Sequence, residues 1–280
     1  MVLRLKLATK AALVAASLTA PVAPASLGEW ARPETVGIAS LSFSYRPAGE
    51  FSQGGRPVDA PWREGSTVGF EIMRDELSGA QYDACAAERV CPPRPASQSR
   101  DPRLPAVLIN YADASAYAAW ISGKTGEVWR LPSDAEWRVA AGSRARDDAL
   151  GAGDASDRWL AKYDAESAAA KNDERLSRLG AGQANENGLY DLSGNVWEWT
   201  ADCFVRYAAG PSGFRPVTTN CGVRVAEGEH RAYLTDFIRD ARSGGCSAGK
   251  PPTYLGVRLV RETKTSGLVA RLRYWLGAVI

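Results

Sequence analysis

Glycine and proline interrupt this chain so often that few segments are long enough for a regular helix or strand. The 280 residues include 27 Gly and 16 Pro, together with nine Trp. Gly and Pro favour turns, and large aromatic rings bury much apolar area per residue. Because 45% of the residues are apolar, the chain can bury a sizeable core, which excludes disordered and collagen-like chains. The composition predicts a loop-rich domain held by aromatic side chains rather than a helical bundle.

The chain has a single histidine, His230, and this excludes several classes of enzyme. A three-His zinc or iron centre cannot be built from one residue, and a Ser-His-Asp triad would have to use His230.

Residues 1–25 have the pattern of a secretory signal peptide. Three basic residues precede the apolar run Ala11 to Ala23, and Ala23-Pro24-Ala25 resembles a cleavage site. A membrane anchor is the alternative, but the run is shorter than the ~20 residues such a helix needs, and Pro21 interrupts it. We expect a periplasmic or secreted protein. Without this segment the net charge falls from +2 to −1, and no basic patch argues for a nucleic-acid partner.

Export to an oxidising compartment favours disulfides among the five cysteines. Four of them allow three connectivities, and proximity in the sequence favours Cys85–Cys91 and Cys203–Cys221. Cys246 is left over, either buried and inert, paired between chains, or reactive.

No internal repeat or long linker divides the chain. We predict a lead-in over residues 26–40, one domain over 41–262 and a tail over 263–280. The tail could form a short amphipathic helix, for which docking on a protein is expected rather than membrane contact. Alternating apolar residues predict terminal strands with one half-buried face, at Leu41 to Tyr45 and at Leu255 to Leu259. Capping signals predict three short helices, which begin after Ser78, Asp113 and Ser133.

The stretch Gly188 to Trp199, GLYDLSGNVWEW, contains the most informative group of candidate ligand residues. Asp191, Glu198 and carbonyl groups of the turn between them are hard oxygen ligands of the kind that calcium prefers. A tryptophan-stapled turn with no ion is the alternative, because two acids seven residues apart satisfy no strict calcium motif. In an extended segment Trp197 and Trp199 would share one face and anchor the turn in the core.

This stretch, together with WRLPSDAEWRVAA (Trp129 to Ala141), VLINYADASAYAAWISGKTG (Val107 to Gly126) and LGVRLV (Leu255 to Val260), resembles the formylglycine-generating enzyme or sulfatase-modifying factor family. The resemblance implies an α+β fold, a variant of the C-type-lectin-like fold, with short helices, mixed sheets, little regular structure and adjacent chain ends. It also implies a structural calcium site formed by the Asp191 and Glu198 side chains and the Gly194 and Val196 carbonyls. Glu76 resembles part of the family's Glu-Val-Thr-Asn element.

In that family, copper-dependent oxidation by oxygen converts a Cys of a partner sulfatase to formylglycine, and two Cys five residues apart hold the copper. Soft thiolates suit Cu(I). Counting from different motifs places the pair on His230 and Thr235, on Glu229 and Leu234, or on Tyr233 and Ile238, and none is Cys. Copper binding is therefore not expected from this pair, although Cys246 could approach His230 in space.

The C-terminal block most resembles exported paralogues associated with nitrite reductase, the NirV type. Its charged and aromatic residues form either a recognition groove or a surface loop with internal ion pairs; they include Tyr233, Asp236, Arg239 and Arg242. Three functions follow as hypotheses. The first is an exported accessory or maturation factor for a partner polypeptide, with a periplasmic metalloenzyme as the expected class of partner. The second is a metal-dependent oxidase rebuilt on His230 and Cys246, and the third is a non-catalytic lectin-like binding module.

Overall fold

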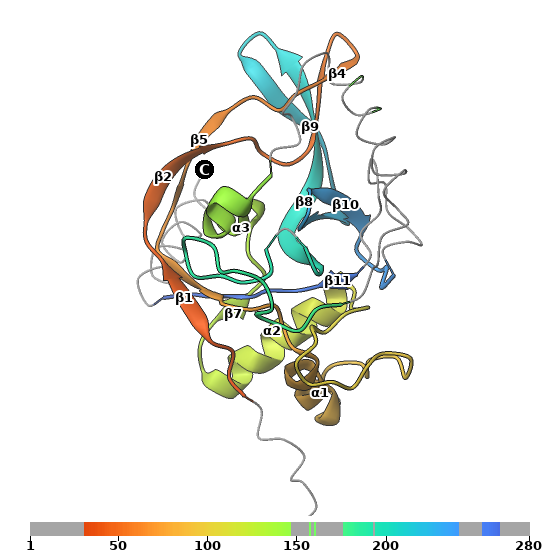
Figure 1. Cartoon of the computed structure of the whole chain (residues 1–280). Coiled ribbons are helices and arrows are strands. Elements are labelled where there is room, and N and C mark those ends of the chain that lie inside the picture. Colours follow the sequence, from red (N-terminus) through yellow and green to blue (C-terminus); the bar gives the residue numbers. More distant parts are fainter. Residues whose placement is uncertain are drawn as a thin grey trace, which may run out of the picture.

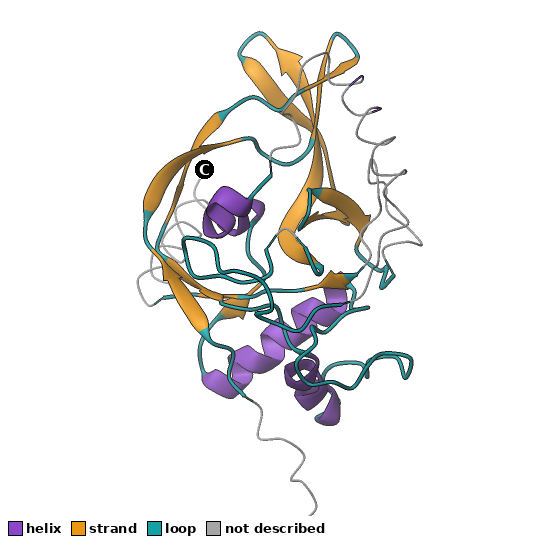
Figure 2. Ribbon diagram, viewed as in Figure 1, coloured by secondary structure: helices purple, strands orange, loops and turns teal. Residues whose placement is uncertain are grey.

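The computed structural model describes residues 31–146, 157, 160, 176–192, 194–240 and 254–263. The signal peptide, Arg242, Cys246 and the tail beyond residue 263 lie outside the described residues. The expected mixed α+β fold is confirmed, because short helices pack against three small sheets joined by long loops (Figures 1 and 2).

The first sheet brings the two ends of the domain together. Its strand order is β1 (Thr35–Ile38), β6 (Phe70–Met73), β12 (Val260–Arg261) and β7 (Trp129–Arg130). Strand β6 pairs antiparallel with β1 on one side and with β12 on the other. The early and late parts of the described chain are therefore neighbours, as the family resemblance implies.

A long hairpin dominates the second sheet. Strands β8 (Trp197–Gly210) and β9 (Gly213–Glu227) form it, and β10 (Ala232–Thr235), β3 (Glu50–Gln53), β4 (Arg56–Val58) and β11 (Leu255–Gly256) extend it. The hairpin rises away from the helices in Figure 1. A third, two-stranded sheet pairs β2 (Leu41–Tyr45) with β5 (Arg63–Thr67).

The two predicted terminal strands differ in outcome. A strand does span Leu41–Tyr45. The prediction of one half-buried strand from Leu255 to Leu259 is wrong, because the chain there makes two separate strands, β11 and β12, and every residue from 255 to 260 is buried. Alternation was misleading because Arg258, which looked like an outward-facing residue, has a buried partner.

Helices α1 (Gly79–Ala87), α2 (Tyr111–Thr125) and α3 (Asp134–Ala141) begin at capping boxes, and a 3₁₀ turn, η1 (Gly142–Arg144), follows α3. The predicted starts after Ser78 and Ser133 are confirmed. For α2 the prediction is wrong by three residues. Asn110 is the cap, since its side chain accepts a hydrogen bond from the Asp113 amide, while the Asp113 carboxylate accepts one from the Asn110 amide.

The core is rich in tryptophan, as the composition predicts. Trp120, Trp129, Trp197 and Trp199 belong to one buried cluster, and Trp137 belongs to a second beside it. Both predicted disulfides are present. In the described part of the chain, no helix has the length and apolar character needed to cross a membrane.

Candidate functional site

The stretch from Gly188 to Trp199 folds as a tight loop that leads into β8. Asp191 and Asn195 both have left-handed backbone conformations, with φ of 60° and 62°, which turn the chain sharply. Both carboxylate oxygens of Asp191 accept backbone hydrogen bonds, from Gly180 at 2.6 Å and from Gly182 at 3.2 Å. The Asp191 side chain thus fixes the segment from Gly180 to Gly182 against its own loop.

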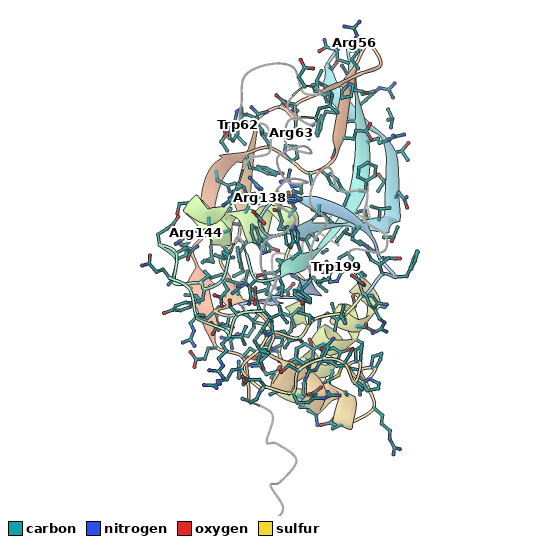
Figure 3. The ribbon with its side chains drawn as sticks, turned by 45° about the vertical axis from the view of Figure 1, so that its right-hand side comes forward. Arg56, Trp62, Arg63, Arg138, Arg144 and Trp199 are labelled. Atoms are coloured by element: carbon teal, nitrogen blue, oxygen red, sulfur yellow. A yellow bond between two sulfur atoms is a disulfide. The ribbon has the colours of Figure 1, made fainter. Side chains whose placement is uncertain are left out.

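The two tryptophans anchor this loop in the core. The indole of Trp197 donates to the carbonyl of His230 at 2.9 Å, and that of Trp199 donates to the carbonyl of Ile109 at 3.0 Å. Figure 3 shows Trp199 inside the body of the molecule. Both indole groups have a partner, which removes the cost of burying their N–H groups.

Between them in sequence, Glu198 lies in a fully buried ion pair with Arg258. The guanidinium of Arg258 donates to both Glu198 oxygens, at 2.9 and 3.1 Å, and the indole of Trp137 donates to Oε2 at 2.7 Å. Arg258 also donates to the carbonyls of Met73, Arg74 and Tyr190. Sequence reasoning found Glu198 but missed Arg258, although Arg258 is part of the LGVR motif.

Glu76 is a third carboxylate near this pair. It is 1% exposed, its Oε2 accepts from the Asn195 amide at 2.7 Å, and its Oε1 has no hydrogen-bond partner. Burial, with the charges of Glu198 and Asp191, raises the pKa of Glu76 well above its usual range. The charge of Arg258 acts on both Glu198 and Glu76, but only Glu198 forms an ion pair with it.

The expected calcium ligands fit that ion in the kind of donor. Asp191 and Glu198 supply carboxylates, Gly194 and Val196 supply carbonyls, and Oε1 of Glu76 is a buried oxygen without a hydrogen-bond partner. Glu198 shares its oxygens with Arg258, and the Gly194 carbonyl accepts from the Val196 amide at 2.8 Å. Among the described residues, no three His, Cys, Asp or Glu side chains are grouped as a metal site. A calcium ion here would depend on backbone carbonyls.

A buried ionic network joins α3 to the segment between β9 and β10. Arg231 donates to both oxygens of Asp134 at 3.1 Å and to Glu227 at 2.9 Å, and Arg138 from α3 lies 3.4 Å from the same Glu227 oxygen. Burial raises the pKa of Glu227 to about 8, against the opposing effect of Arg231. No sequence motif signalled this network, because its members come from α3 and from the end of β9.

Motif counting offers six positions for the family's Cys pair, of which His230, Leu234 and Ile238 are buried, Tyr233 and Thr235 are half-buried, and Glu229 is exposed. His230 is 5% exposed, its ring packs edge-on against Trp197 at 5.4 Å, and its Nδ1 lies 3.0 Å from the Arg231 carbonyl. Thr235 lies on β10 with its hydroxyl buried, and Leu234 and Ile238 are in the core. All four cysteines among the described residues are in disulfides.

The residues of the expected recognition groove are largely used within the fold. The Tyr233 hydroxyl accepts from the Gly49 amide at 2.8 Å, and Arg239 donates to Asp113 at 2.9 Å. The backbone of Asp236 bonds to Tyr111 and Gly222. Phe237, which sequence reasoning did not select, is 72% exposed and is the most solvent-accessible large apolar side chain among the described residues.

Comparisons with known proteins agree with the fold described above. Residues 33–263 match the family model described as the sulfatase-modifying factor enzyme 1-like domain. A bovine protein, inactive C-alpha-formylglycine-generating enzyme 2, is 32% identical over 166 residues, which cover 53% of this chain and 52% of that protein. The formylglycine-generating enzyme of Streptomyces coelicolor is 34% identical over 121 residues, or 40% of this chain and 37% of that one.

The chain thus spans about half the length, or less, of these curated relatives. Among solved structures, PvdO from Pseudomonas aeruginosa superposes with a TM-score of 0.54 and 25% identity, covering 82% of this chain and 95% of that one. Because the family model covers most of the chain, this protein belongs to the sulfatase-modifying factor family.

Proposed function

We propose that the protein is an exported accessory or maturation factor that binds a partner polypeptide and does not carry out the family's copper-dependent oxidation. The observation that carries this proposal is the missing thiolate pair, because none of the three pairs of positions reached by motif counting contains a Cys. By the count from LGVR the pair would be His230, which is buried, and Thr235, whose hydroxyl is buried. A threonine hydroxyl does not replace a soft thiolate as a Cu(I) ligand.

The names of two relatives support the absence of catalysis, and the disulfides support export. Two similar mammalian proteins, bovine and mouse, are named inactive formylglycine-generating enzymes. Disulfides persist in oxidising compartments, so Cys85–Cys91 and Cys203–Cys221 favour a periplasmic or secreted location together with the N-terminal signal pattern. A periplasmic metalloenzyme remains the proposed class of partner.

A direct assay tests the loss of oxidation. The mature protein, loaded with Cu(I) and supplied with oxygen, is incubated with a cysteine-containing sulfatase peptide, and the peptide mass is followed. We expect no formylglycine and no retained copper, while an active formylglycine-generating enzyme converts the peptide in parallel. Conversion, or copper retained near one per chain, would favour the rebuilt oxidase instead.

The exposed Phe237 gives the partner-binding test a defined surface. A lone exposed aromatic ring is a suitable anchor for a polypeptide, since aromatic residues dominate many binding surfaces. Cross-linked capture from periplasm should recover a specific partner with the wild-type chain, at least tenfold less with Phe237→Ala, and an unchanged amount with Val128→Ala. Val128 is also exposed, at 54%, and serves as the matched control. Recovery of no specific partner, where a control complex survives, counts against the proposal.

We further propose that calcium binds the Asp191 to Glu198 segment and stabilises the fold. Calcium at about 100 times its Kd would add about 2.7 kcal/mol and raise Tm by several degrees relative to chelator-treated protein. Asp191→Asn should remove most of that increase, whereas the exposed Glu64→Gln should keep it. An identical Tm with calcium and with chelator would refute calcium binding here.

A further inference from the structure

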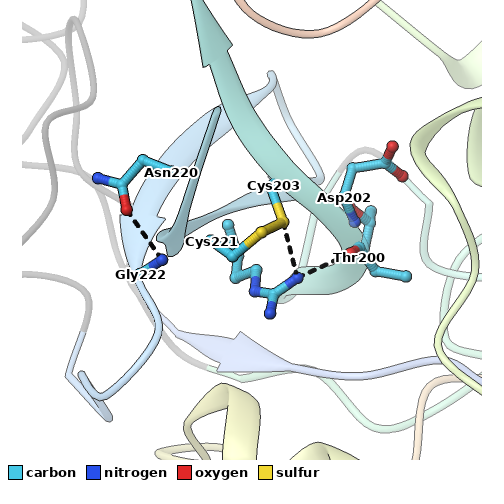
Figure 4. Close-up of a disulfide and its surroundings, with 8 residues drawn as sticks. Thr200, Asp202, Cys203, Asn220, Cys221 and Gly222 are labelled. Atoms are coloured by element: carbon cyan, nitrogen blue, oxygen red, sulfur yellow. Dashed lines mark hydrogen bonds between the residues drawn. A yellow bond between two sulfur atoms is a disulfide. The ribbon is translucent and has the colours of Figure 1, made fainter. Parts of the chain in front are cut away.

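The two disulfides occupy very different surroundings. Cys85 and Cys91 are 0% and 3% exposed, inside the main core cluster. Cys203 and Cys221 join β8 to β9 where the pairing of the hairpin is irregular, and Cys221 is exposed while Cys203 is half-buried (Figure 4). The second disulfide is therefore the one of the two that lies at the surface, with Cys221 as its more exposed residue.

An arginine contacts the less exposed sulfur. Nη1 of Arg224 lies 3.2 Å from the Cys203 Sγ and donates to the Ala201 carbonyl at 2.9 Å. The guanidinium also stacks over the Tyr111 ring, 4.1 Å from its centre, which holds it in place.

The charge of Arg224 is not used by an ion pair. Among the described residues no carboxylate pairs with it, and its Nε is buried without a hydrogen-bond partner. A nearby cation lowers the pKa of a thiol, and a thiol of lower pKa is a better leaving group in disulfide exchange. The site therefore combines an open point of attack at Cys221 with a stabilised leaving group at Cys203.

We propose that Cys203–Cys221 is an exchange disulfide that oxidises a pair of cysteine thiols on a partner polypeptide. The proposal rests on the proposed function only for the polypeptide nature of the substrate. Phe237 belongs to the same surface, because the amide of its neighbour Asp236 donates to the carbonyl of Gly222, the residue after Cys221, at 3.0 Å. Its exposed ring is placed to contact a polypeptide that approaches the disulfide.

The reaction balances without a further reagent. A partner thiolate attacks Sγ of Cys221 and forms a mixed disulfide, while the electron pair of the broken S–S bond leaves on Sγ of Cys203 beside Arg224. The second partner thiolate then attacks the partner's own sulfur in the mixed disulfide and releases Cys221. The partner loses two electrons and two thiol protons, and Cys203 and Cys221 gain them, with the protons passing through solvent.

The first experiment measures how fast dithiothreitol reduces each disulfide in the mature chain, with Cys246→Ala to remove the fifth thiol. Alkylation and peptide mass spectrometry follow both pairs in one sample. We expect Cys203–Cys221 to be reduced at least about tenfold faster than Cys85–Cys91, because exposed disulfides are the labile ones. Equal rates for the two disulfides would overturn the proposal, and this comparison needs no substitution at the site.

Variants at Arg224 test the stabilised leaving group. Arg224→Met should slow the reduction by about threefold for each unit by which the Cys203 thiol pKa rises, as Brønsted behaviour of thiols implies. The thiolate absorbance of the reduced protein should show that rise directly. Arg224→Lys should restore most of the rate, and Arg215→Met, which removes an exposed positive charge elsewhere on β9, should leave it unchanged. An unchanged thiol pKa in Arg224→Met would contradict the assigned role.

A final pair of variants tests the direction of attack. At about pH 10, where free thiols with a pKa near 8.5 or lower are ionised, the free Cys221 of Cys203→Ala should form a mixed disulfide with oxidised glutathione much faster than Cys203 does in Cys221→Ala. The reverse order would overturn attack at Cys221. These measurements use small thiols and disulfides only, so failure to capture a partner leaves them intact, and slow exchange leaves partner binding intact.

Discussion

At the scale of single residues, the Glu198–Arg258 pair is the most sensitive point of the molecule. Both side chains are buried, and Arg258 bonds to Glu198 and to three backbone carbonyls. Arg258→Met leaves a buried carboxylate without its cation and should lower the free energy of unfolding by about 3–5 kcal/mol. Urea denaturation measures the change. The exposed pair Arg206–Glu50 is the control, since Arg206→Met should change the free energy of unfolding by about 1 kcal/mol or less.

Glu227 should make stability depend on pH. Folding raises its pKa from 4.5 to about 8, so between these values the folded chain holds a proton that the unfolded chain has lost. The free energy of unfolding should therefore fall as pH rises from about 5 to about 8, and burial of Glu76 acts in the same direction. Urea unfolding across this range should show a smaller fall in Glu227→Gln. A wild-type stability that rises across the range would contradict the assignment.

At the scale of elements, α2 offers two substitutions of opposite sign. Asn110→Ala removes the N-cap acceptor and should cost about 1 kcal/mol. Gly123 lies inside the same helix, and a Cβ added there meets no atom within 4 Å, so Gly123→Ala should stabilise by about 0.5–1 kcal/mol. Urea denaturation and helical circular dichroism of the two variants test the pair. A loss of stability in Gly123→Ala would show that the helix surface is occupied.

The helices and disulfides show which features could be predicted from the sequence. Local signals worked, because the capping boxes at Ser78 and Ser133 and both disulfides depend on residues close together in the chain. Asp113 was assigned the wrong role because Asn110 and Asp113 cap reciprocally, and either one alone looks like a cap.

Features that depend on distant partners could not be predicted in the same way. The sequence pattern placed Arg258 on the polar face of a strand. In the fold it is buried and pairs with Glu198, which lies 60 residues earlier in the chain. The Glu227 network has the same origin, with Asp134 supplied by α3. Arg224 and Cys203 are 21 residues apart in the sequence, and they touch because the β8–β9 hairpin pairs them in register.

At the scale of the whole molecule, the late segment Tyr254 to Thr263 holds the two main sheets together. Its strand β11 pairs with β8, its strand β12 lies between β6 and β7, and Arg258 lies between the two strands. Removing it opens the first sheet between β6 and β7, takes the partner strand β11 from β8, and leaves Glu198 without its cation. A chain that ends at residue 253 should therefore not fold.

Near-ultraviolet circular dichroism of the truncated chain should lack the tryptophan signals of the full chain, because the buried indoles lose their fixed surroundings. Limited proteolysis should cleave it throughout, including within the α1 to α3 region. Full-length Arg258→Met separates the loss of one ion pair from the loss of the strands, and it should keep the near-ultraviolet spectrum while unfolding at lower urea. A native-like spectrum in the truncated chain would mean that the remaining strands close the sheets without β12, and that the joined ends are not needed for folding.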